Sequence, residues 1–348
     1  MSNQMAASVE VDDSSQVSLQ AARAGELART QTQRCAHSTL RVLMYHRIGR
    51  AEDSPELNPV TLSATPEGFE RQMAMVVRRY TVVGIDEVIA SVTEARPLPP
   101  RAVLITFDDA YDCFARHAWP VLRKYGAAAT MFVPTAFPDS QREFWWDAVH
   151  RILDASAEVG RLATPAGEFD TGTVESRRRA NHRLAEWAAR TPFDAVEAWL
   201  ESQREAWGLS RLAAPVMSWD AIRELAAEGA AFAPHSRTHP PLTCVSPSRL
   251  RDEIVGSISD LKTQLLNPAP AFAYPGGFVS PRIVNETAAA GCLVGLSTRR
   301  GAERIRTCDP LLIRRINVGR RATPFKLRLQ LALPPLLLNR LCCLLGCP

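Results

Sequence analysis

Two adjacent carboxylates, Asp108 and Asp109, follow an apolar run, Val103–Phe107, that is typical of a buried strand. Side chains alternate along a strand, so both acids can serve one site only if the chain turns there, which Ala110–Asp112 permits. One acid could then bind a metal while its neighbour faces a substrate. The simpler alternative is a helix cap, although a single Asp would be enough for that.

Two histidines four residues apart, His235 and His239, lie in a proline-flanked loop directly after another strand-like segment, residues 230–233. Two imidazoles and one carboxylate supply the three protein ligands of an open catalytic metal site, with a fourth position left for water. This donor set predicts zinc (Zn2+), with cobalt, nickel or manganese as alternatives. A histidine pair in such a loop would by itself more often be incidental, but the acid pair at a second strand end favours a metal site.

Strand-like and helix-like segments alternate along most of the chain, which is typical of repeated βα units. Seven or eight such units favour a parallel barrel over an open sheet, and functional residues of a barrel lie at the carboxyl ends of its strands. His46 and Tyr274 also follow strand-like segments, so they are expected at the same face as the acids and the histidine pair. The predicted strands are 39–45, 80–83, 103–109, 127–133, 230–233, 271–274, 292–297 and 311–316.

The alternation breaks between residues 139 and about 216, where helical patterns occur without a strand candidate. We predict that this segment is an inserted helical subdomain overhanging the mouth of the barrel. Trp145 and Trp146 within it could stack on a sugar ring. Aromatic residues at helical spacing are more often part of a core, and that alternative remains open.

Composition limits the classes of function. The chain has 348 residues, 46% of them hydrophobic, and can bury a large core. Its formal net charge of +4 comes from basic residues spread along the chain, so no nucleic-acid partner is predicted. Eight cysteines without a Cys-x-x-Cys pair indicate reduced thiols and favour the cytoplasm, including the inner face of the membrane.

The two ends of the chain differ from the rest. Residues 1–39 are rich in Ser, Gln and Ala and lack the apolar segment of a secretory signal, so we predict a disordered leader. Residues 321–348 form a predicted apolar helical tail, whose hydrophobic run is interrupted by Pro334 and Pro335 and is short for a membrane span. A packing helix or a peripheral contact with a membrane surface is expected instead.

Three segments, Thr106–Asp109, His235–Pro240 and Phe272–Pro275, resemble in order and spacing the motifs of NodB-type polysaccharide deacetylases, the fourth carbohydrate esterase family. The resemblance runs from about residue 42 to 318. It implies an α/β fold, a distorted parallel (β/α)7-type barrel over residues 40–320, that hydrolyses N-acetyl groups of an amino sugar with a divalent metal. Three flanking segments resemble the exopolysaccharide-associated branch: Val42–His46, Arg123–Gly126 and Met217–Trp219.

Positions in the family motifs imply roles for individual residues. By that resemblance Asp109, His235 and His239 would hold the metal, and Asp108 would be the general base for the attacking water. The backbone N–H of Tyr274 would bind the oxyanion. The implied substrate is an N-acetylated saccharide, either a polysaccharide or a lipid-linked oligosaccharide, and the oligomeric state stays open.

Several positions depart from the family pattern. Ala110 replaces the usual glycine after the acid pair, and Leu296–Thr298 stands where many members carry the Leu-x-His general acid. His46, in a Tyr-His context at the end of the first predicted strand, is the predicted substitute, with a histidine bonded to a loop carbonyl as the alternative. Two other functions remain open: an O-acetyl esterase on the same scaffold and a catalytically impaired carbohydrate-binding relative.

Overall fold

The computed structural model describes residues 39–333 and residue 337 of the chain. Seven parallel strands form a nearly closed barrel in the order β10-β11-β13-β1-β5-β6-β9. The ring approaches closure where the Ala269 N–H donates to the Phe232 carbonyl at 2.8 Å. The predicted α/β barrel is therefore confirmed. Its strands are β1 (Thr39–Tyr45), β5 (Ala102–Asp108), β6 (Thr130–Val133), β9 (Ala231–Pro234), β10 (Ala271–Ala273), β11 (Val294–Arg300) and β13 (Ile313–Asn317).

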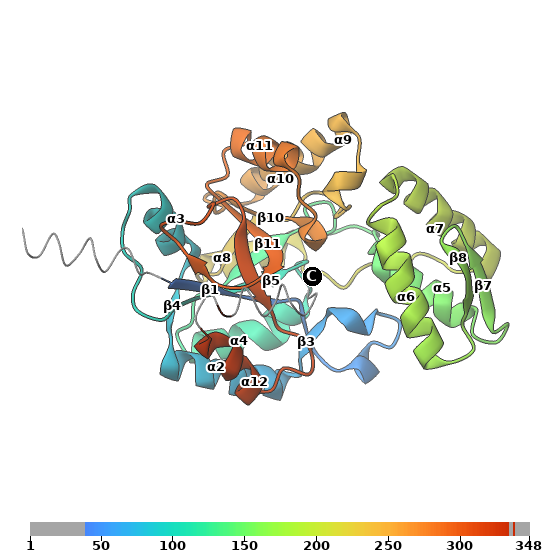
Figure 1. Ribbon diagram of the computed structural model, residues 1–348, viewed down its shortest axis with the longest axis horizontal. Helices are drawn as coiled ribbons and strands as arrows, with labels where there is room; N and C mark the ends of the chain where they lie inside the picture. The colour runs from blue at the N-terminus through green and yellow to red at the C-terminus, as the bar shows by residue number, and fades with distance from the viewer. Residues whose placement is uncertain (1–38, 334–336, 338–348) are drawn as a thin grey trace, which may run out of the picture.

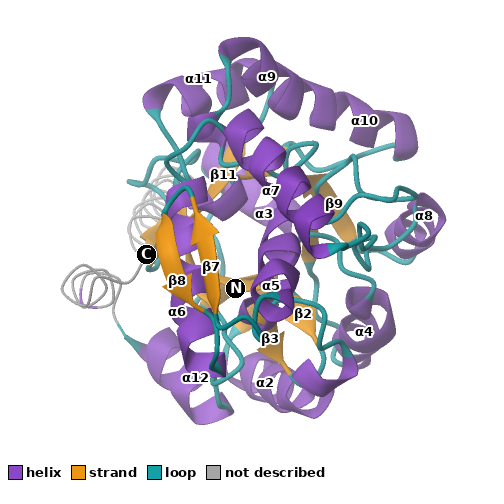
Figure 2. Ribbon diagram, turned by 90° about the vertical axis from the view of Figure 1, so that its right-hand side faces the viewer, coloured by secondary structure: helices purple, strands orange, loops and turns teal. Residues whose placement is uncertain are grey.

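Helices surround this barrel (Figures 1 and 2). Most begin where the sequence offers a cap: the Thr65 hydroxyl accepts the Gly68 N–H and the Ser218 hydroxyl accepts the Ala221 N–H. The helices are α2 (Pro66–Arg79), α3 (Ile85–Thr93), α4 (Trp119–Lys124), α8 (Trp219–Ala227), α9 (Pro247–Arg251), α10 (Ser257–Gln264), α11 (Pro281–Ala289) and α12 (Pro324–Ala332). Short accessory strands are β2 (Arg47–Ile48), β3 (Leu62–Ala64), β4 (Thr81–Val83) and β12 (Glu303–Arg304).

Two helical segments of the barrel contain π turns. Residues Phe114–Ala118 form a π turn before α4, and Asp252–Gly256 form another between α9 and α10. A π turn inserts an extra residue without changing which residue types favour the helix, so hydrophobic spacing does not reveal it. The second of these turns carries a residue that contacts the candidate site.

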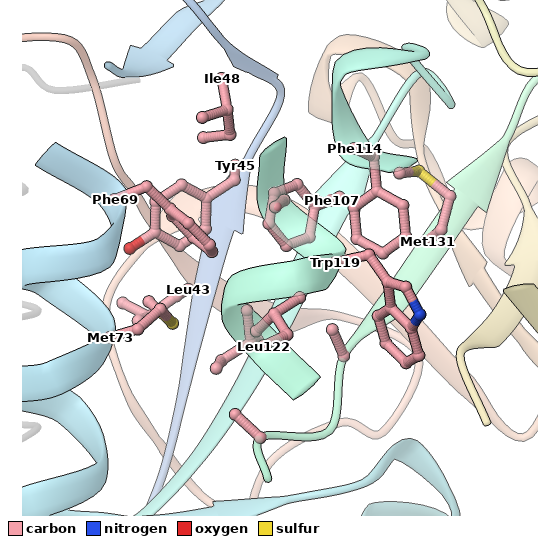
Figure 3. Packing of buried hydrophobic residues seen from close by; sticks show 14 of the residues in the cluster. Leu43, Tyr45, Ile48, Phe69, Met73, Phe107, Phe114, Trp119, Leu122 and Met131 are labelled. Carbon is pink, nitrogen blue, oxygen red and sulfur yellow. The ribbon is translucent and has the colours of Figure 1, made fainter. Parts of the chain in front are cut away.

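Strand side chains divide between the barrel interior and the surrounding layer of helices. On β5, Phe107 points outward, where its ring stacks at 5.2 Å on Tyr45 and meets Phe114 at 4.8 Å (Figure 3). Leu104 belongs instead to the interior cluster, which it shares with Val42 of β1. The alternation along β5 therefore directs Asp108, like Leu104, toward the interior.

The segment between β6 and α8 forms a separate layer, which we call the insertion (residues 145–207). It contains α5 (Trp145–Ala155), α6 (Val174–Ala188), α7 (Phe193–Trp207) and the antiparallel hairpin of β7 (Arg161–Thr164) and β8 (Gly167–Asp170). These elements have their own hydrophobic core, which includes Ile152, Leu184 and Val196. Figure 2 shows the insertion in front of one end of the barrel.

The expectation of helices alone in this segment is wrong because of the β7–β8 hairpin. Its two strands are four residues each and mostly exposed, so they lack the apolar alternation by which a half-buried strand is recognised. Gly167, at φ 119°, opens β8 in a conformation that disfavours other residues.

Little of the predicted terminal segments is described. Of the predicted leader, residues 1–39, only Thr39 lies within the described residues, at the start of β1. Within the predicted tail, the structure describes residues 321–333 and residue 337. Helix α12 lies in this part of the chain and buries Leu327 and Leu331 in the same hydrophobic cluster as α2. Among the described residues, no helix combines the length and apolar character needed to cross a membrane. The four described cysteines are all free: Cys113, Cys244, Cys292 and Cys308.

Candidate metal and catalytic site

The chain turns sharply at the end of β5, as the adjacent acids require. Asp109 and Ala110 have φ angles of 72° and 54°, in the left-handed region that residues with a Cβ rarely adopt. This turn sends the two carboxylates to different partners. Ala110 is fully buried there, in a backbone conformation that glycine would adopt at less cost.

Asp108 forms a buried ion pair with Arg315 of β13. The two guanidinium nitrogens Nη1 and Nη2 each donate to one carboxylate oxygen at 2.7 Å, and Arg315 Nε donates to the Ser297 carbonyl at 3.0 Å. Burial raises the pKa of Asp108, but Arg315, with smaller contributions from His235 and His46, outweighs burial and holds that pKa below its usual value. Asp108 is therefore ionised, with a fixed orientation.

Arg315, which is fully buried although it carries a charge, was not predicted as a site residue from the sequence. The sequence does contain a feature that could have identified it. Arg315 lies two residues after Ile313 in a predicted barrel strand, so both side chains are on the same face of that strand. A buried arginine needs an acidic partner, and the inward-facing Asp108 was available.

Asp109, His235 and His239 converge on one small volume. Asp109 Oδ1 lies 3.3 Å from His239 Nε2 and 3.6 Å from His235 Nε2, and the two Nε2 atoms are 3.1 Å apart. All three residues are buried, and one ligand atom from each lies within 4.8 Å of the others. The residues that the sequence predicts as metal ligands are thus brought together.

The electrostatic state of this cluster fits a cation. Burial holds the pKa of His235 at about 4, and burial together with His235 holds the pKa of His239 well below its usual value, so both imidazoles are neutral. Burial, followed by the charges of Asp108 and Asp147, raises the pKa of Asp109. Asp109 Oδ1 has no hydrogen-bond partner among the described residues. A cation would satisfy this oxygen and the converging nitrogens together.

The two imidazoles are held by the ends of β9 and β10. His235 Nδ1 lies 2.7 Å from the Ala273 carbonyl, so its Nδ1–H donates there and Nε2 presents a lone pair to the cluster. The Ser236 hydroxyl accepts the His239 N–H at 3.1 Å. Ser236 and His239 have φ angles of 62° and 58°, so the loop between the histidines is strained and depends on such contacts.

Aromatic side chains of the insertion cover His239. The Trp146 ring meets the His239 ring edge-on at 4.7 Å and stacks on Phe144 at 4.3 Å. Trp146 Nε1 donates to the Tyr111 hydroxyl at 3.2 Å, and Trp146 is only 8% exposed. Trp146 is therefore part of a packed wall over a candidate ligand, not an open platform for a sugar.

His46 lies at the end of β1, as predicted. Its backbone N–H donates to the Ser63 hydroxyl at 2.9 Å, and its side chain is partly exposed. Burial lowers the pKa of His46 and the charge of Asp108 opposes that shift, so the imidazole lies within electrostatic range of Asp108. Within residues 39–333, no hydrogen bond joins this imidazole to a loop carbonyl.

Tyr274 does not have the geometry expected of an oxyanion donor. Its backbone N–H donates to the Leu296 carbonyl at 3.1 Å, and its side chain is fully buried. The expectation that this N–H binds an oxyanion is therefore not supported, because pairing with β11 already uses the donor.

Asp147 of α5 is a further buried acid that the sequence analysis missed. Its Oδ1 accepts the Asn58 N–H at 2.7 Å, while its Oδ2 has no partner among the described residues. Burial raises the pKa of Asp147 to about 7. An acid in the first turn of a helix is common for reasons of capping and dipole, so its position gave no distinct functional signal.

Comparison with known proteins agrees with the motifs. Residues 95–295, more than half of the chain, match the family model described as polysaccharide deacetylase. This region includes Asp108, Asp109 and both histidines, whereas His46 and Arg315 lie outside it. A putative polysaccharide deacetylase of Bacillus subtilis (strain 168), YxkH, is 33% identical over 95 residues, which cover 27% of this chain and 31% of that protein. The match thus spans less than a third of that relative.

Solved structures share the fold. The Streptococcus pyogenes deacetylase PplD, determined with acetate, aligns with a TM-score of 0.56 at 21% identity, covering 85% of this chain and 99% of that one. IcaB from Ammonifex degensii aligns with a TM-score of 0.55 at 18% identity, covering 85% and 98%. At these identities the similarity concerns the fold alone.

The buried ion pair predicts a large loss of stability when one partner is removed. Arg315→Met leaves the Asp108 charge uncompensated and should lower the free energy of unfolding by about 3–5 kcal/mol. Arg178→Met is the control, because Arg178 pairs with Glu175 at 2.7 Å and the two side chains are 71% and 56% exposed; about 1 kcal/mol or less is expected. Denaturant unfolding measures both, and equal losses would contradict a special role for the buried pair.

Proposed function

Because the chain belongs to the polysaccharide deacetylase family, we propose that it is a metal-dependent hydrolase that removes N-acetyl groups from amino sugars of a polysaccharide or lipid-linked oligosaccharide. The observation that carries this proposal is the convergence of Asp109, His235 and His239 beside an ionised Asp108. A purely structural barrel has no need of neutral imidazoles and an unpaired carboxylate oxygen buried together. The proposed metal is zinc, which commonly binds one carboxylate and two imidazoles.

The metal would be held by Asp109 Oδ1 and the Nε2 atoms of His235 and His239. A divalent cation bound there would polarise the acetyl carbonyl as a Lewis acid and make a water molecule more acidic. The protein prepares the site by keeping both imidazoles neutral and by fixing the tautomer of His235 through the Ala273 carbonyl.

Asp108 would accept the proton of the attacking water. Arg315 has two opposite effects on this role. It keeps Asp108 ionised and oriented, and it also lowers the basicity of the carboxylate. Proton transfer to a weakened base is favourable only if the water is itself acidified, so the base and the cation site must act together.

The amine that leaves after the carbon–nitrogen bond breaks needs a proton, and we assign this to His46. Its imidazole is partly exposed and lies within electrostatic range of Asp108 and Arg315. Burial lowers the pKa of His46, so its imidazolium is a stronger acid toward the amine but less populated, and the charge of Asp108 opposes this shift and favours the protonated form.

A cavity of about 480 Å³ beside the histidine loop supports a substrate longer than one sugar. Its lining includes Thr238, Arg142 and Trp219 but none of the candidate metal ligands. A cavity of this size can hold a sugar unit or more, and an indole beside polar groups suits a pyranose ring. A saccharide chain reaching the cluster could extend past Thr238 into this cavity.

The proposed activity is tested with purified protein on matched N-acetylated and O-acetylated oligosaccharides. We expect acetate release from the N-acetylated compounds, loss of activity after chelation, and recovery on addition of zinc. Acetate release from O-acetylated compounds alone would identify the enzyme as an esterase on the same scaffold. Stoichiometric metal binding without turnover on either panel would indicate a carbohydrate-binding relative.

The two adjacent acids should respond differently to the same change. Asp109→Asn removes a charged ligand and should weaken zinc binding, measured by titration against a competing chelator. Asp108→Asn should leave zinc bound and lower turnover by roughly 10²–10⁴, the usual range for a general base. Thermal melting checks that Asp108→Asn folds, because Arg315 loses its charged partner. Near wild-type turnover of folded, zinc-loaded Asp108→Asn would show that another group activates the water.

The proton donor is tested by leaving group. His46→Ala should lower turnover of an N-acetylated sugar, whose amine needs a proton, by roughly 10²-fold or more. It should have a small effect on an activated aryl acetate, whose leaving group departs unprotonated. Equal losses on both substrates would show that His46 has no role in protonating the leaving group.

A further inference from the structure

One buried carboxylate, Glu253, holds the loop between the two candidate histidine ligands. Glu253 lies in the π turn after α9, is 2% exposed, and accepts the backbone N–H groups of Arg237 and Thr238 at 2.8 Å each. The Thr238 hydroxyl also donates to it. Three donors on one carboxylate fix a loop whose left-handed residues would otherwise relax.

The loop has a second attachment to the barrel through Arg237. Its guanidinium pairs with Asp252 at 2.7 Å and with Asp260 at 2.8 Å. Gly256 leaves room for this side chain, since a Cβ at that position would come within 2.7 Å of Arg237 Nε. These contacts connect the loop to the helices of the barrel and do not reach the insertion.

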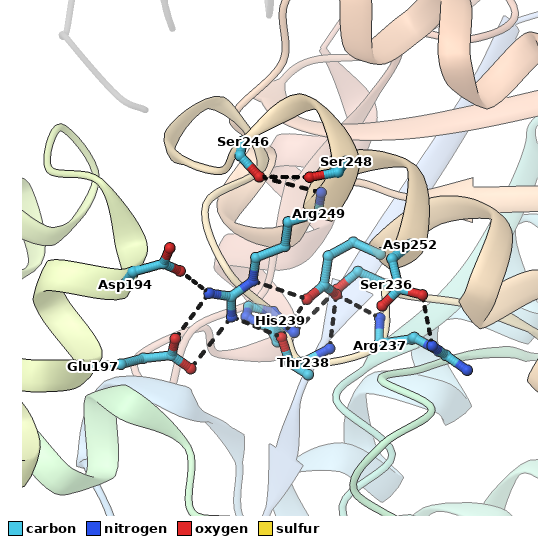
Figure 4. A network of polar contacts seen from close by, with 11 residues as sticks. Asp194, Glu197, Ser236, Arg237, Thr238, His239, Ser246, Ser248, Arg249 and Asp252 are labelled. Carbon is cyan, nitrogen blue, oxygen red and sulfur yellow. Dashed lines mark hydrogen bonds and ion pairs between the residues drawn. The ribbon is translucent and has the colours of Figure 1, made fainter.

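Arg249 does reach the insertion (Figure 4). Its Nη1 donates to Glu197 of α7 at 2.8 Å and also contacts Asp194, and its guanidinium lies 5.4 Å from the centre of the Phe193 ring. On the other side, Arg249 Nη2 donates to the Thr238 hydroxyl at 3.4 Å and Nε lies 3.7 Å from Glu253. One guanidinium thus bridges the insertion and the histidine loop.

Two structural routes lead from Arg249 to His239. The direct route passes through Glu253 and Thr238 to the loop that carries the histidine. The second passes through α7, whose Val196 and Leu200 share a hydrophobic core with Val149 and Ile152 of α5. Helix α5 begins with the tryptophan pair, and Trp146 lies against the His239 ring at 4.7 Å. Moving α7 would therefore move the aromatic wall over the site.

We propose that Arg249 is a positioning residue. It couples the position of the insertion relative to the barrel to the geometry of the metal-binding histidines. This inference rests on the proposed function, because it takes His239 as a metal ligand. Arg249 touches neither the candidate ligands nor the base. Its effect reaches the site through contacts to both sides, so metal affinity and the docking of the insertion depend on each other.

The test uses full-length protein and zinc alone, with the zinc dissociation constant measured by chelator competition. Three variants are compared with wild type: Arg249→Met, the insertion variant Asp194→Asn with Glu197→Gln, and all three changes combined. Each of the first two should weaken zinc binding by about 10-fold, the lower end of the range for residues that support ligands. The combined variant should be weaker by much less than the product, since both changes break the same bridge.

Controls separate positioning from general damage. Arg251→Met lies on the same helix but contacts Glu286 at 3.9 Å on the exposed side, and it should bind zinc as wild type does. Arg249→Lys keeps the charge but not the planar fork, and it should fall between wild type and Arg249→Met. Amide exchange in α7 should become faster in Arg249→Met and in the insertion variant. Amide exchange can be measured without enzymatic activity and in any variant that remains folded.

Three outcomes would contradict this inference, and each points to a different failed assumption. If wild type binds zinc but the insertion variant binds it within twofold of wild type, Arg249 acts only through Glu253 and the coupling does not exist. If wild type binds no zinc, the proposed function fails before the coupling is tested. Additive losses in the combined variant would also contradict the bridge, because independent contacts would then be responsible.

Discussion

Two carboxylates lie side by side in a buried site, and the protein supplies a counter-charge to only one of them. Arg315 neutralises Asp108 through two hydrogen bonds of 2.7 Å inside the barrel. Asp109 faces two neutral imidazoles and keeps an unpaired oxygen. Burying two adjacent negative charges without two positive partners is unfavourable, so Asp109 must be protonated or must bind a cation. The turn at Asp109 and Ala110 creates this asymmetry by directing the acids to different partners.

The sequence predicted the parts of this arrangement that are local. Strand alternation and caps located most elements, and the strand ends located Asp108, Asp109, His46 and the histidine pair at one face. Arg315 was missed because its partner Asp108 is 207 positions away in the chain. No local sequence pattern predicts which inward-facing side chains form an ion pair. The same limit applies to Tyr274, where the sequence placed the residue at the right strand end but could not show that Leu296 already accepts its N–H.

Other differences have local causes that hydrophobic periodicity does not record. The hairpin of β7 and β8 is exposed on most of its surface, so its strands have no apolar face to detect. The π turn at Asp252–Gly256 shifts the helix register by one residue and brings Glu253 under the histidine loop. Ala110 shows a different case, because it stands where the family pattern has glycine and adopts φ 54°, in the left-handed region. The surrounding core evidently holds a backbone conformation that alanine alone would not choose.

The two ionic connections near the site differ in strength. Asp108 and Arg315 are 3% and 0% exposed, and separating them would leave a buried charge, so this pair belongs to the rigid barrel. The carboxylates that bind Arg249 from the insertion are much more exposed, with Asp194 at 79% and Glu197 at 46%. Exposed ion pairs contribute about 1 kcal/mol or less, because water and salt compete for both partners. The ion pairs of Arg249 with the insertion are therefore individually weak, whereas the base is fixed by a pair that is strong. Separating α7 from Arg249 therefore costs less than separating Asp108 from Arg315, so α7 can move at this contact while the base stays fixed.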